Sequence, residues 1–230
     1  IGALNTNTTY AGTIINGSTT TAIRKVGTGS LTLTNSNSYS GGTIIDGGML
    51  LVNNTTGPAT GTGGVNDHAG GALGGSGSVE GPVYNSAGCV SPGGHGTIGT
   101  LTITAPGYTQ GANAELTIDL AGDGESDVLA VLGDVYLDGM LTLVFSQPTA
   151  EQDSWLILKN LGTNPIVGTF DGLEEGAIFH VSGSSNPLYI TYLGGDGNDI
   201  VLTAVPEPAS LALLTLAAGS LGGYIRRRRR

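Results

Sequence analysis

The chain has 230 residues, of which 41 are glycine, 11% are charged and 5% are aromatic. An average globular enzyme has many more charged and helix-forming residues, whereas glycine and small polar residues mixed with Val, Ile and Leu are typical of short strands joined by tight turns. Residues 1–205 hold 17 Asp and Glu side chains against only Arg24, Lys25 and Lys159. Such an acidic body would be repelled by nucleic acid and by anionic lipid, so we expect no nucleic-acid partner.

The N-terminal part contains a repeat. Residues 10–17 recur as residues 39–47, with Tyr10 and Tyr39 spaced 29 positions apart, and residues 27–35 have a weaker copy at 96–104. In repeat proteins each unit buries its apolar face by stacking on its neighbours. A repeat near 30 residues therefore favours a β-solenoid over a β-sandwich.

Alternating or β-branched runs predict the strands. No stretch before residue 207 predicts a long amphipathic helix, and residues 57–78, with nine glycines, predict a loop or very short strands. At about 22 residues and ~4.8 Å per coil, residues 1–205 would form about nine coils. The expected strands are Leu31–Thr34, Met49–Val52, Leu101–Thr104, Glu115–Leu120, Val128–Val131, Val135–Leu137, Met140–Phe145, Trp155–Leu158, Ile178–Val181, Tyr189–Tyr192 and Ile200–Thr203.

Two acidic stretches are candidates for calcium. Residues 194–202 fit the nonapeptide of calcium-binding β-rolls, with Asp196 and Asp199 as candidate ligands, but the motif occurs once, so a tight turn is favoured. Residues 119–127 carry four carboxylates without the spacing of an EF-hand loop, and we expect a solvated turn there. We therefore expect no cofactor, with a calcium-stabilised adhesin as an alternative.

The residues offer little for catalysis. His68, His95 and His180 lie far apart without metal-type spacing, and a lyase acting on polyanions would lack cations. Cys89 is the sole cysteine, so no intrachain disulfide can form, and it is expected to be a small buried or turn-adjacent residue. We expect a non-enzymatic protein. The alternative is a carbohydrate-active β-helix enzyme or glycan-binding module whose site lies upstream of this fragment.

The C-terminus has the composition of a membrane anchor. Residues 209–225 carry no charge, and as a helix they would span about 26 Å, the short end of what crosses a bilayer. The basic residues after them would hold the C-terminus in the cytoplasm by the positive-inside rule. The expected anchor residues are Leu211, Leu213, Leu214, Leu216, Leu221 and Ile225, and the orienting residues are Arg226, Arg227, Arg228, Arg229 and Arg230.

A short motif precedes this span: Val205, Pro206, Glu207 and Pro208. Two prolines around one residue prevent regular helix or sheet and favour an extended segment, which is the shape that proteases bind.

With the apolar span and arginine run, this motif closely resembles the PEP-CTERM sorting signal of Gram-negative bacteria, thought to be processed by exosortases. The resemblance implies an exported protein with an exosortase-type protease as a partner. Its precursor would be anchored transiently in the inner membrane, and its mature form would lie at the cell surface or outside the cell. Such proteins are commonly associated with exopolysaccharide or biofilm matrix. We expect the export signal to lie upstream of Ile1.

The body also resembles a known family. Residues 27–53, with Ser30–Thr34, Tyr39–Thr43 and Gly47–Leu50, look like the autotransporter-associated β-strand repeat. Residues 90–93, 99–103 and 126–129 look like passenger sequences of that kind. The resemblance implies an all-β chain folded as a right-handed parallel β-helix over residues 1–204, followed by a sorting segment with a single hydrophobic helix over residues 205–230. Since the chain ends in that segment, we do not expect autotransport. The expected role is a β-solenoid spacer or adhesin.

Overall fold

The computed structural model describes residues 1–104, 106–146 and 153–205, and this part of the chain is all-β apart from one short 3-10 helix, η1 (Gly122–Gly124). The strands form three sheets of seven. Sheet A contains β1 (Thr8–Tyr10), β3 (Leu31–Leu33), β5 (Gly48–Val52), β7 (Gly71–Gly75), β10 (Cys89–Pro92), β13 (Glu115–Leu120) and β16 (Met140–Phe145). Sheet B contains β2 (Ile23–Lys25), β4 (Thr43–Ile45), β6 (Val65–Asp67), β9 (Val83–Asn85), β12 (Gly107–Gln110), β15 (Asp134–Leu137) and β18 (Val167–Gly168). Sheet C contains β8 (Ser78–Val79), β11 (Thr100–Ile103), β14 (Val128–Val131), β17 (Ser154–Asn160), β21 (Asp199–Ala204), β20 (Leu188–Gly194) and β19 (Ile178–Phe179).

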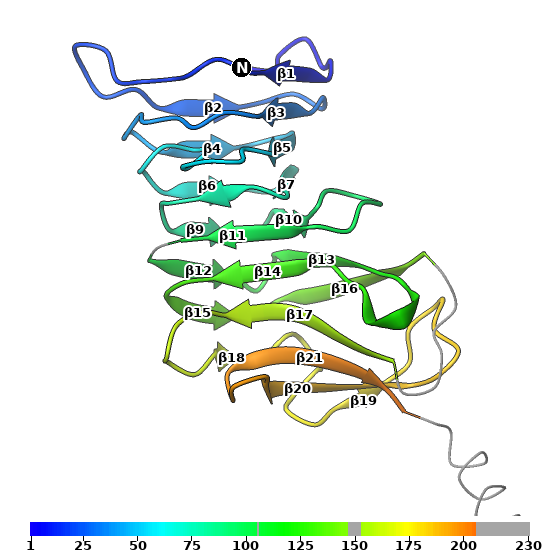
Figure 1. Ribbon diagram of the computed structural model, residues 1–230. Coiled ribbons are helices and arrows are strands. Elements are labelled where there is room, and N and C mark those ends of the chain that lie inside the picture. Colours follow the sequence, from blue (N-terminus) through cyan, green and yellow to red (C-terminus); the bar gives the residue numbers. More distant parts are fainter. Residues whose placement is uncertain (105, 147–152, 206–230) are drawn as a thin grey trace, which may run out of the picture.

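From β1 to β7 the chain alternates between sheets A and B, and from β8 to β18 it passes through sheets C, B and A in turn. The coils stack along one axis, with β1 at one end and β19–β21 at the other (Figure 1). All neighbouring strands of sheets A and B pair in parallel, as in the pair Leu31 and Leu50. This arrangement bears out the all-β, parallel-stranded prediction. The right-handed sense of the coil stays a prediction.

Coil length varies more than the sequence indicated. Leu73 pairs with Val90, 17 positions later, whereas Tyr136 pairs with Val167, 31 positions later. Sheets A and B each hold seven parallel strands, one per coil, so the expectation of about nine coils was wrong. Turns between strands absorb the difference, because stacking constrains only the paired residues.

The core is a set of columns running along the axis. Leu50 pairs with Leu31 on one side and Leu73 on the other, and Leu116 pairs with Val90 and Leu141. Leu50, Leu73, Val90 and Leu116 are fully buried. Each coil therefore covers the apolar side chains of the one before it, which a single coil could not bury alone.

The glycine-rich stretch 57–78 was predicted as loop or as strands too short to identify, but it contains β6, β7 and part of β8. Its glycines allow coils to approach closely. A Cβ at Gly71 would clash with the Asp67 carboxylate and would lie 2.5 Å from the Ile45 carbonyl oxygen. Glycine is used here for close packing between coils, a role that composition does not distinguish from a loop.

The repeat visible in the sequence is not the stacking period. Tyr10 pairs with Leu33, 23 positions later, and lies partly exposed in β1. Tyr39 is fully buried, and its hydroxyl lies 2.6 Å from Thr43 Oγ1. The two tyrosines therefore occupy different environments despite their similar flanks.

The final strands depart from the parallel pattern. β17 pairs with β21, β21 with β20, and β20 with β19, all antiparallel. A tight turn after β20, in which the Gly197 N–H donates to the Gly194 carbonyl oxygen at 2.8 Å, makes the hairpin possible. The hairpin strands contribute four fully buried side chains, Leu188, Ile190, Ile200 and Leu202, so this hairpin covers the end of the core.

Candidate functional site

The solenoid continues to the first residue of the sorting motif. β21 ends at Ala204, whose N–H donates to the Asp153 carbonyl oxygen at 2.8 Å. The Val205 N–H donates to the Pro187 carbonyl oxygen at 2.9 Å. The motif residue Pro206 therefore follows directly on a hydrogen-bonded residue of the folded body, without a linker.

The other residues expected to carry sorting lie outside the described residues. They are Pro206, Glu207 and Pro208, the anchor residues Leu211 to Ile225, and Arg226 to Arg230, together with the predicted C-terminal helix. Over residues 1–104, 106–146 and 153–205, no helix has the length and apolarity needed to span a bilayer.

The two calcium candidates have different surroundings. Asp196 is exposed on the turn between β20 and β21. Asp199 is buried, and its Oδ1 accepts the N–H of Asn160 at 2.8 Å, so this carboxylate caps the end of β17. Burial raises the pKa of Asp199. Within the described ranges, no three His, Cys, Asp or Glu side chains form a group that could hold a metal ion. The predicted tight turn is present, with the Gly197 N–H donating to the Gly194 carbonyl oxygen, and the absence of calcium stays a prediction.

The acidic stretch 119–127 was expected to be a solvated turn, and for two of its residues this was wrong. Asp119 and Asp127 are buried. Asp127 accepts the N–H of Gly99 at 2.8 Å and that of Asp119 at 3.0 Å, while Asp119 accepts the N–H of Gly96 at 2.6 Å. These carboxylates hold the loop between β10 and β11 against sheet A, a pairing across coils that local composition does not reveal. Burial raises the pKa of Asp127 to about 7.

A polar column runs inside the corner between sheets B and A, which the sequence analysis missed. Register places four polar residues in line on successive coils, Lys25, Asp67, Asn85 and Gln110, with the apolar Ile45 between the first two. Lys25 Nζ donates to three backbone carbonyl oxygens at 2.9 to 3.2 Å, and Gln110 Nε2 donates to two at 2.8 and 3.0 Å. Period-2 alternation marks these positions as inward, which was the available signal.

Asp67 is the exception in this column. It is fully buried, and neither carboxyl oxygen has a hydrogen-bond partner meeting normal geometry within the described part of the chain. Burial raises the pKa of Asp67 to about 8, against a smaller opposing effect of the backbone amides of Cys89 and Leu73. The carboxyl therefore lies where its neutral form is favoured.

A short ion-pair chain crosses three coils on the outer surface. Arg24 Nε contacts Asp46 Oδ2, and His68 Nδ1 lies 2.8 Å from Asp46 Oδ1. Hydrogen bonds from Arg24 and His68 lower the pKa of Asp46. Exposed pairs of this kind contribute little to stability, because solvent screens the charges.

Cys89 is half-buried at the start of β10, and its Sγ lies 3.3 Å from Thr117 Oγ1. Burial raises the pKa of the Cys89 thiol to about 11. A thiol with a raised pKa is a poor nucleophile at neutral pH, so its environment fits a structural residue.

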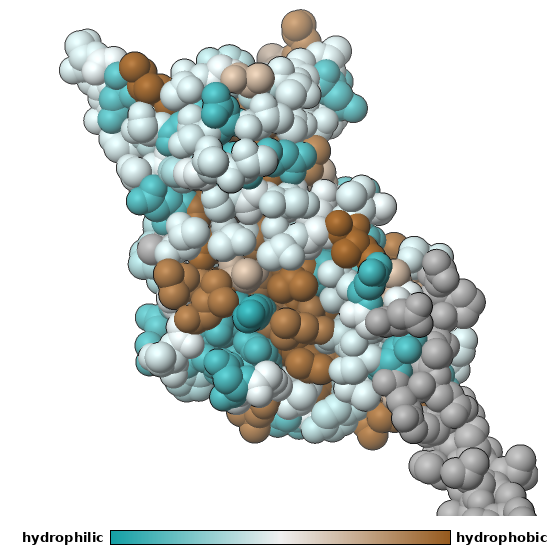
Figure 2. Space-filling model, viewed as in Figure 1, coloured by the Kyte–Doolittle hydropathy of each residue, from teal (hydrophilic) through white to brown (hydrophobic). Residues whose placement is uncertain are grey.

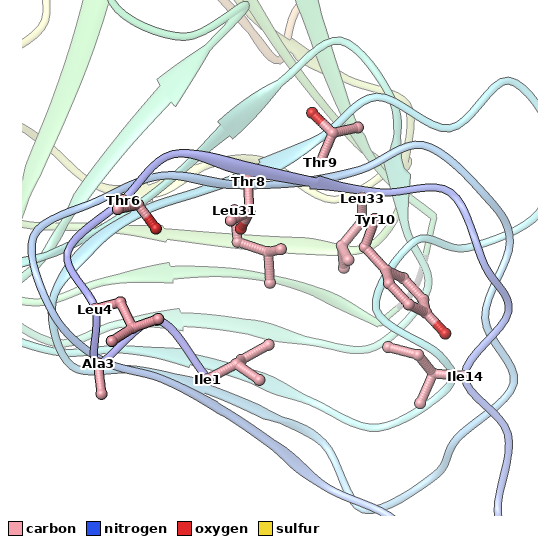
Figure 3. Close-up of a pocket in the computed structure, with 11 residues that line it drawn as sticks. Ile1, Ala3, Leu4, Thr6, Thr8, Thr9, Tyr10, Ile14, Leu31 and Leu33 are labelled. Atoms are coloured by element: carbon pink, nitrogen blue, oxygen red, sulfur yellow. The ribbon is translucent and has the colours of Figure 1, made fainter.

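A cavity of about 480 Å³ opens at the β1 end of the stack. In Figure 3, Tyr10, Ile14, Leu31 and Leu33 point into this space, with Ile1 on the opposite side. The lining is apolar, and Tyr10 is the one ionisable side chain among its eleven residues. This cavity is the interior of the first coil seen from its open end.

Figure 2 shows the face that carries β11, β14, β17 and β21, mostly polar or neutral at the upper coils, with apolar side chains gathered over the lower ones. Leu132 and Leu161 are nearly half exposed and follow the paired residues Val131 and Asn160. Leu156 and Val201 are paired and partly buried on neighbouring strands.

Fold and junction together define a class of protein: a mainly parallel β-solenoid whose last strand leads directly into a C-terminal segment of sorting-signal composition. Residues 204–230 match the family model of the PEP-CTERM protein-sorting motif, and residues 23–52 match that of the passenger-associated-transport-repeat. A search of curated proteins finds no match. Both matches confirm the two resemblances. The repeat match runs from the first residue of β2 to the last of β5.

The sorting motif carries the functional information in these matches. It implies an exported protein with a membrane-anchored precursor of Gram-negative type, processed at its C-terminus by an exosortase-type enzyme. The repeat match agrees with the parallel coils of sheets A and B.

Proposed function

We propose that this chain is a non-enzymatic structural protein of the bacterial cell surface or extracellular matrix. The β-solenoid serves as a spacer or adhesive rod, and the motif Pro206, Glu207 and Pro208 is the processing site. The apolar segment 209–225 anchors the precursor in the inner membrane, and the five arginines orient it. The mature form is retained in the matrix through contact with exopolysaccharide.

The observation that carries this proposal is the junction. Backbone hydrogen bonds hold the chain in the last coil as far as Val205, and the family match to the sorting motif begins at Ala204. The folded body and the sorting signal are therefore contiguous. An attachment at the C-terminus would therefore fix the rod at the end that carries the hairpin of β20 and β21.

The location of the carboxylates supports a non-enzymatic role. Asp119, Asp127 and Asp199 bind backbone amides within the fold. A glycosidase needs two carboxyl groups facing each other across a substrate site. Carboxylates that cap strands and loops are already engaged in holding coils together.

The test is localisation in the native host. Antibody labelling of intact cells and fractionation should find the wild-type chain at the surface or in the matrix. The triple variant Pro206→Ala, Glu207→Ala and Pro208→Ala should accumulate in the inner-membrane fraction. Glu174→Ala, a change at an exposed glutamate of the body, serves as the control and should localise as wild type. Surface display of the triple variant at wild-type levels would refute the proposed processing site.

A further inference from the structure

Two tyrosines stand on the outer face of sheet B at alternate coils. Tyr84 of β9 pairs with Thr109 of β12, and Thr109 pairs with Tyr136 of β15. Tyr84 is 47% exposed and Tyr136 is 46% exposed, while the neighbours of each along its strand are buried. The two phenol rings therefore project from the same face, one small residue apart.

The rings border a shallow trough of about 170 Å³, which Pro82, Pro106, Gly107 and Asp134 also line. Neighbouring strands lie about 4.8 Å apart, so alternate strands place the two tyrosines about 10 Å apart along the axis. Gly107 adds no side chain to the trough, and a Cβ there would clash with the Asp134 backbone. Because the packing of Gly107 on Asp134 leaves no room for a side chain, the floor of the trough between the rings of Tyr84 and Tyr136 stays low.

The chemistry of the trough fits a sugar chain. A phenol ring offers a flat apolar face with a polar edge, which suits the C–H face of a pyranose and its ring of hydroxyl groups. The separation of the two strands that carry the tyrosines, about 10 Å along the axis, is close to the repeat of two units in an extended β-1,4-linked chain. Thr109 and Asp134, between and beside the rings, offer hydrogen-bond partners for hydroxyl groups.

Other occupants fit less well. The trough, at about 170 Å³, is smaller than the roughly 300–1,000 Å³ typical of enclosed small-molecule sites. The Asp134 carboxylate and the acidic body oppose an acidic polymer. A neutral chain that lies across the coils needs neither enclosure nor a large apolar area.

We propose that Tyr84 and Tyr136 form a binding strip for a neutral β-1,4-linked glycan that runs along the solenoid axis. This proposal rests on the function proposed above, and gives the rod a means of attachment to a polysaccharide matrix.

The test is calorimetric titration of the purified full chain with cellohexaose, and with the α-linked maltohexaose for comparison. Wild type should bind cellohexaose in preference to maltohexaose. Tyr84→Ala and Tyr136→Ala should each weaken binding about tenfold, since each removes one stacking ring, a loss of about 1.4 kcal/mol. Tyr84→Phe, which keeps the ring, should retain most of the affinity.

Tyr10→Ala is the matched control, because Tyr10 is 42% exposed but belongs to sheet A. Its affinity should equal that of wild type, and the fluorescence of buried Trp155 should verify that every variant is folded. Absence of cellohexaose binding by wild type, equal binding by the double variant Tyr84→Ala and Tyr136→Ala, or a preference for maltohexaose would each overturn the strip. Normal surface localisation of a wild-type chain that binds no glycan would leave the sorting function standing, so the two proposals fail separately.

Discussion

Burial raises the pKa of Asp67 to about 8 and that of Asp127 to about 7. An aspartate in an unfolded chain has a pKa of about 3.9, so between about pH 4 and 8 the folded state binds more protons than the unfolded state. The stabilising contribution of these two carboxyl groups should therefore be fully present below about pH 4 and should be lost progressively as the pH rises from there toward 8. Denaturant titrations followed by Trp155 fluorescence at several pH values measure this slope.

Asp67→Asn isolates the largest part of this effect. The amide cannot ionise, so the variant should lose much of the pH dependence and gain about 1–3 kcal/mol relative to wild type at pH 8. Asp134→Asn, at an exposed carboxylate of β15, is the control and should keep the wild-type slope. Identical slopes for wild type and Asp67→Asn would show that the Asp67 carboxyl is solvated.

Asp199 allows a prediction about calcium. Because its Oδ1 accepts the Asn160 N–H while Asp196 is exposed on the turn, we expect the midpoint of thermal unfolding to be equal in calcium and in chelator. Asp199→Ala should lower the free energy of unfolding by about 1–3 kcal/mol by leaving a buried amide unpaired. A rise of several degrees on adding calcium would instead support the calcium-stabilised adhesin.

At the scale of elements, the antiparallel hairpin of β20 and β21 should stabilise the end of the solenoid. Leu202 is fully buried and pairs with Trp155, so Leu202→Ala should cost about 2–5 kcal/mol. Leu193, in the same hairpin, is 65% exposed, and Leu193→Ala should change stability by less than about 0.5 kcal/mol. Urea unfolding monitored by Trp155 fluorescence distinguishes them, and equal effects would mean that the hairpin is not packed on the core.

Strands with clear alternation were predictable from the sequence. Glu115–Leu120, Val128–Val131 and Met140–Phe145 have the bounds that their residue patterns predict. Gly71–Gly75 was missed, because three of its five residues are glycine and its packing depends on close approach by adjacent coils. The antiparallel end was also missed, since strand direction depends on the length and geometry of the connection and not on the strand itself.

The candidate site likewise has parts that the sequence predicts and parts that it does not. The sorting motif was recognisable because its three parts are contiguous in the chain, from Pro206 to Arg230. The contacts of Asp119 and Asp127 with the loop at Gly96 and Gly99 join residues 23 and 28 positions apart, and no local pattern encodes them. Similarly, the column of Tyr84, Thr109 and Tyr136 exists only in the register of three coils of unequal length.

For the whole molecule, the stack of seven strands per sheet suggests a rod about 30 Å long over the described coils, at about 4.8 Å per strand. Its dominant charge is negative, which favours solubility and disfavours contact with polyanions. The rod, the hairpin at one end and the adjoining sorting motif are the features on which the proposed spacer role rests.

Intact mass of the mature protein from the native host tests this account most directly. We expect the wild-type chain to lack the apolar segment 209–225 and the arginines after it, and the variant with alanine at positions 206, 207 and 208 to retain them. A complete C-terminus in both proteins would contradict processing at this motif and would leave a chain that is anchored permanently by its C-terminal segment.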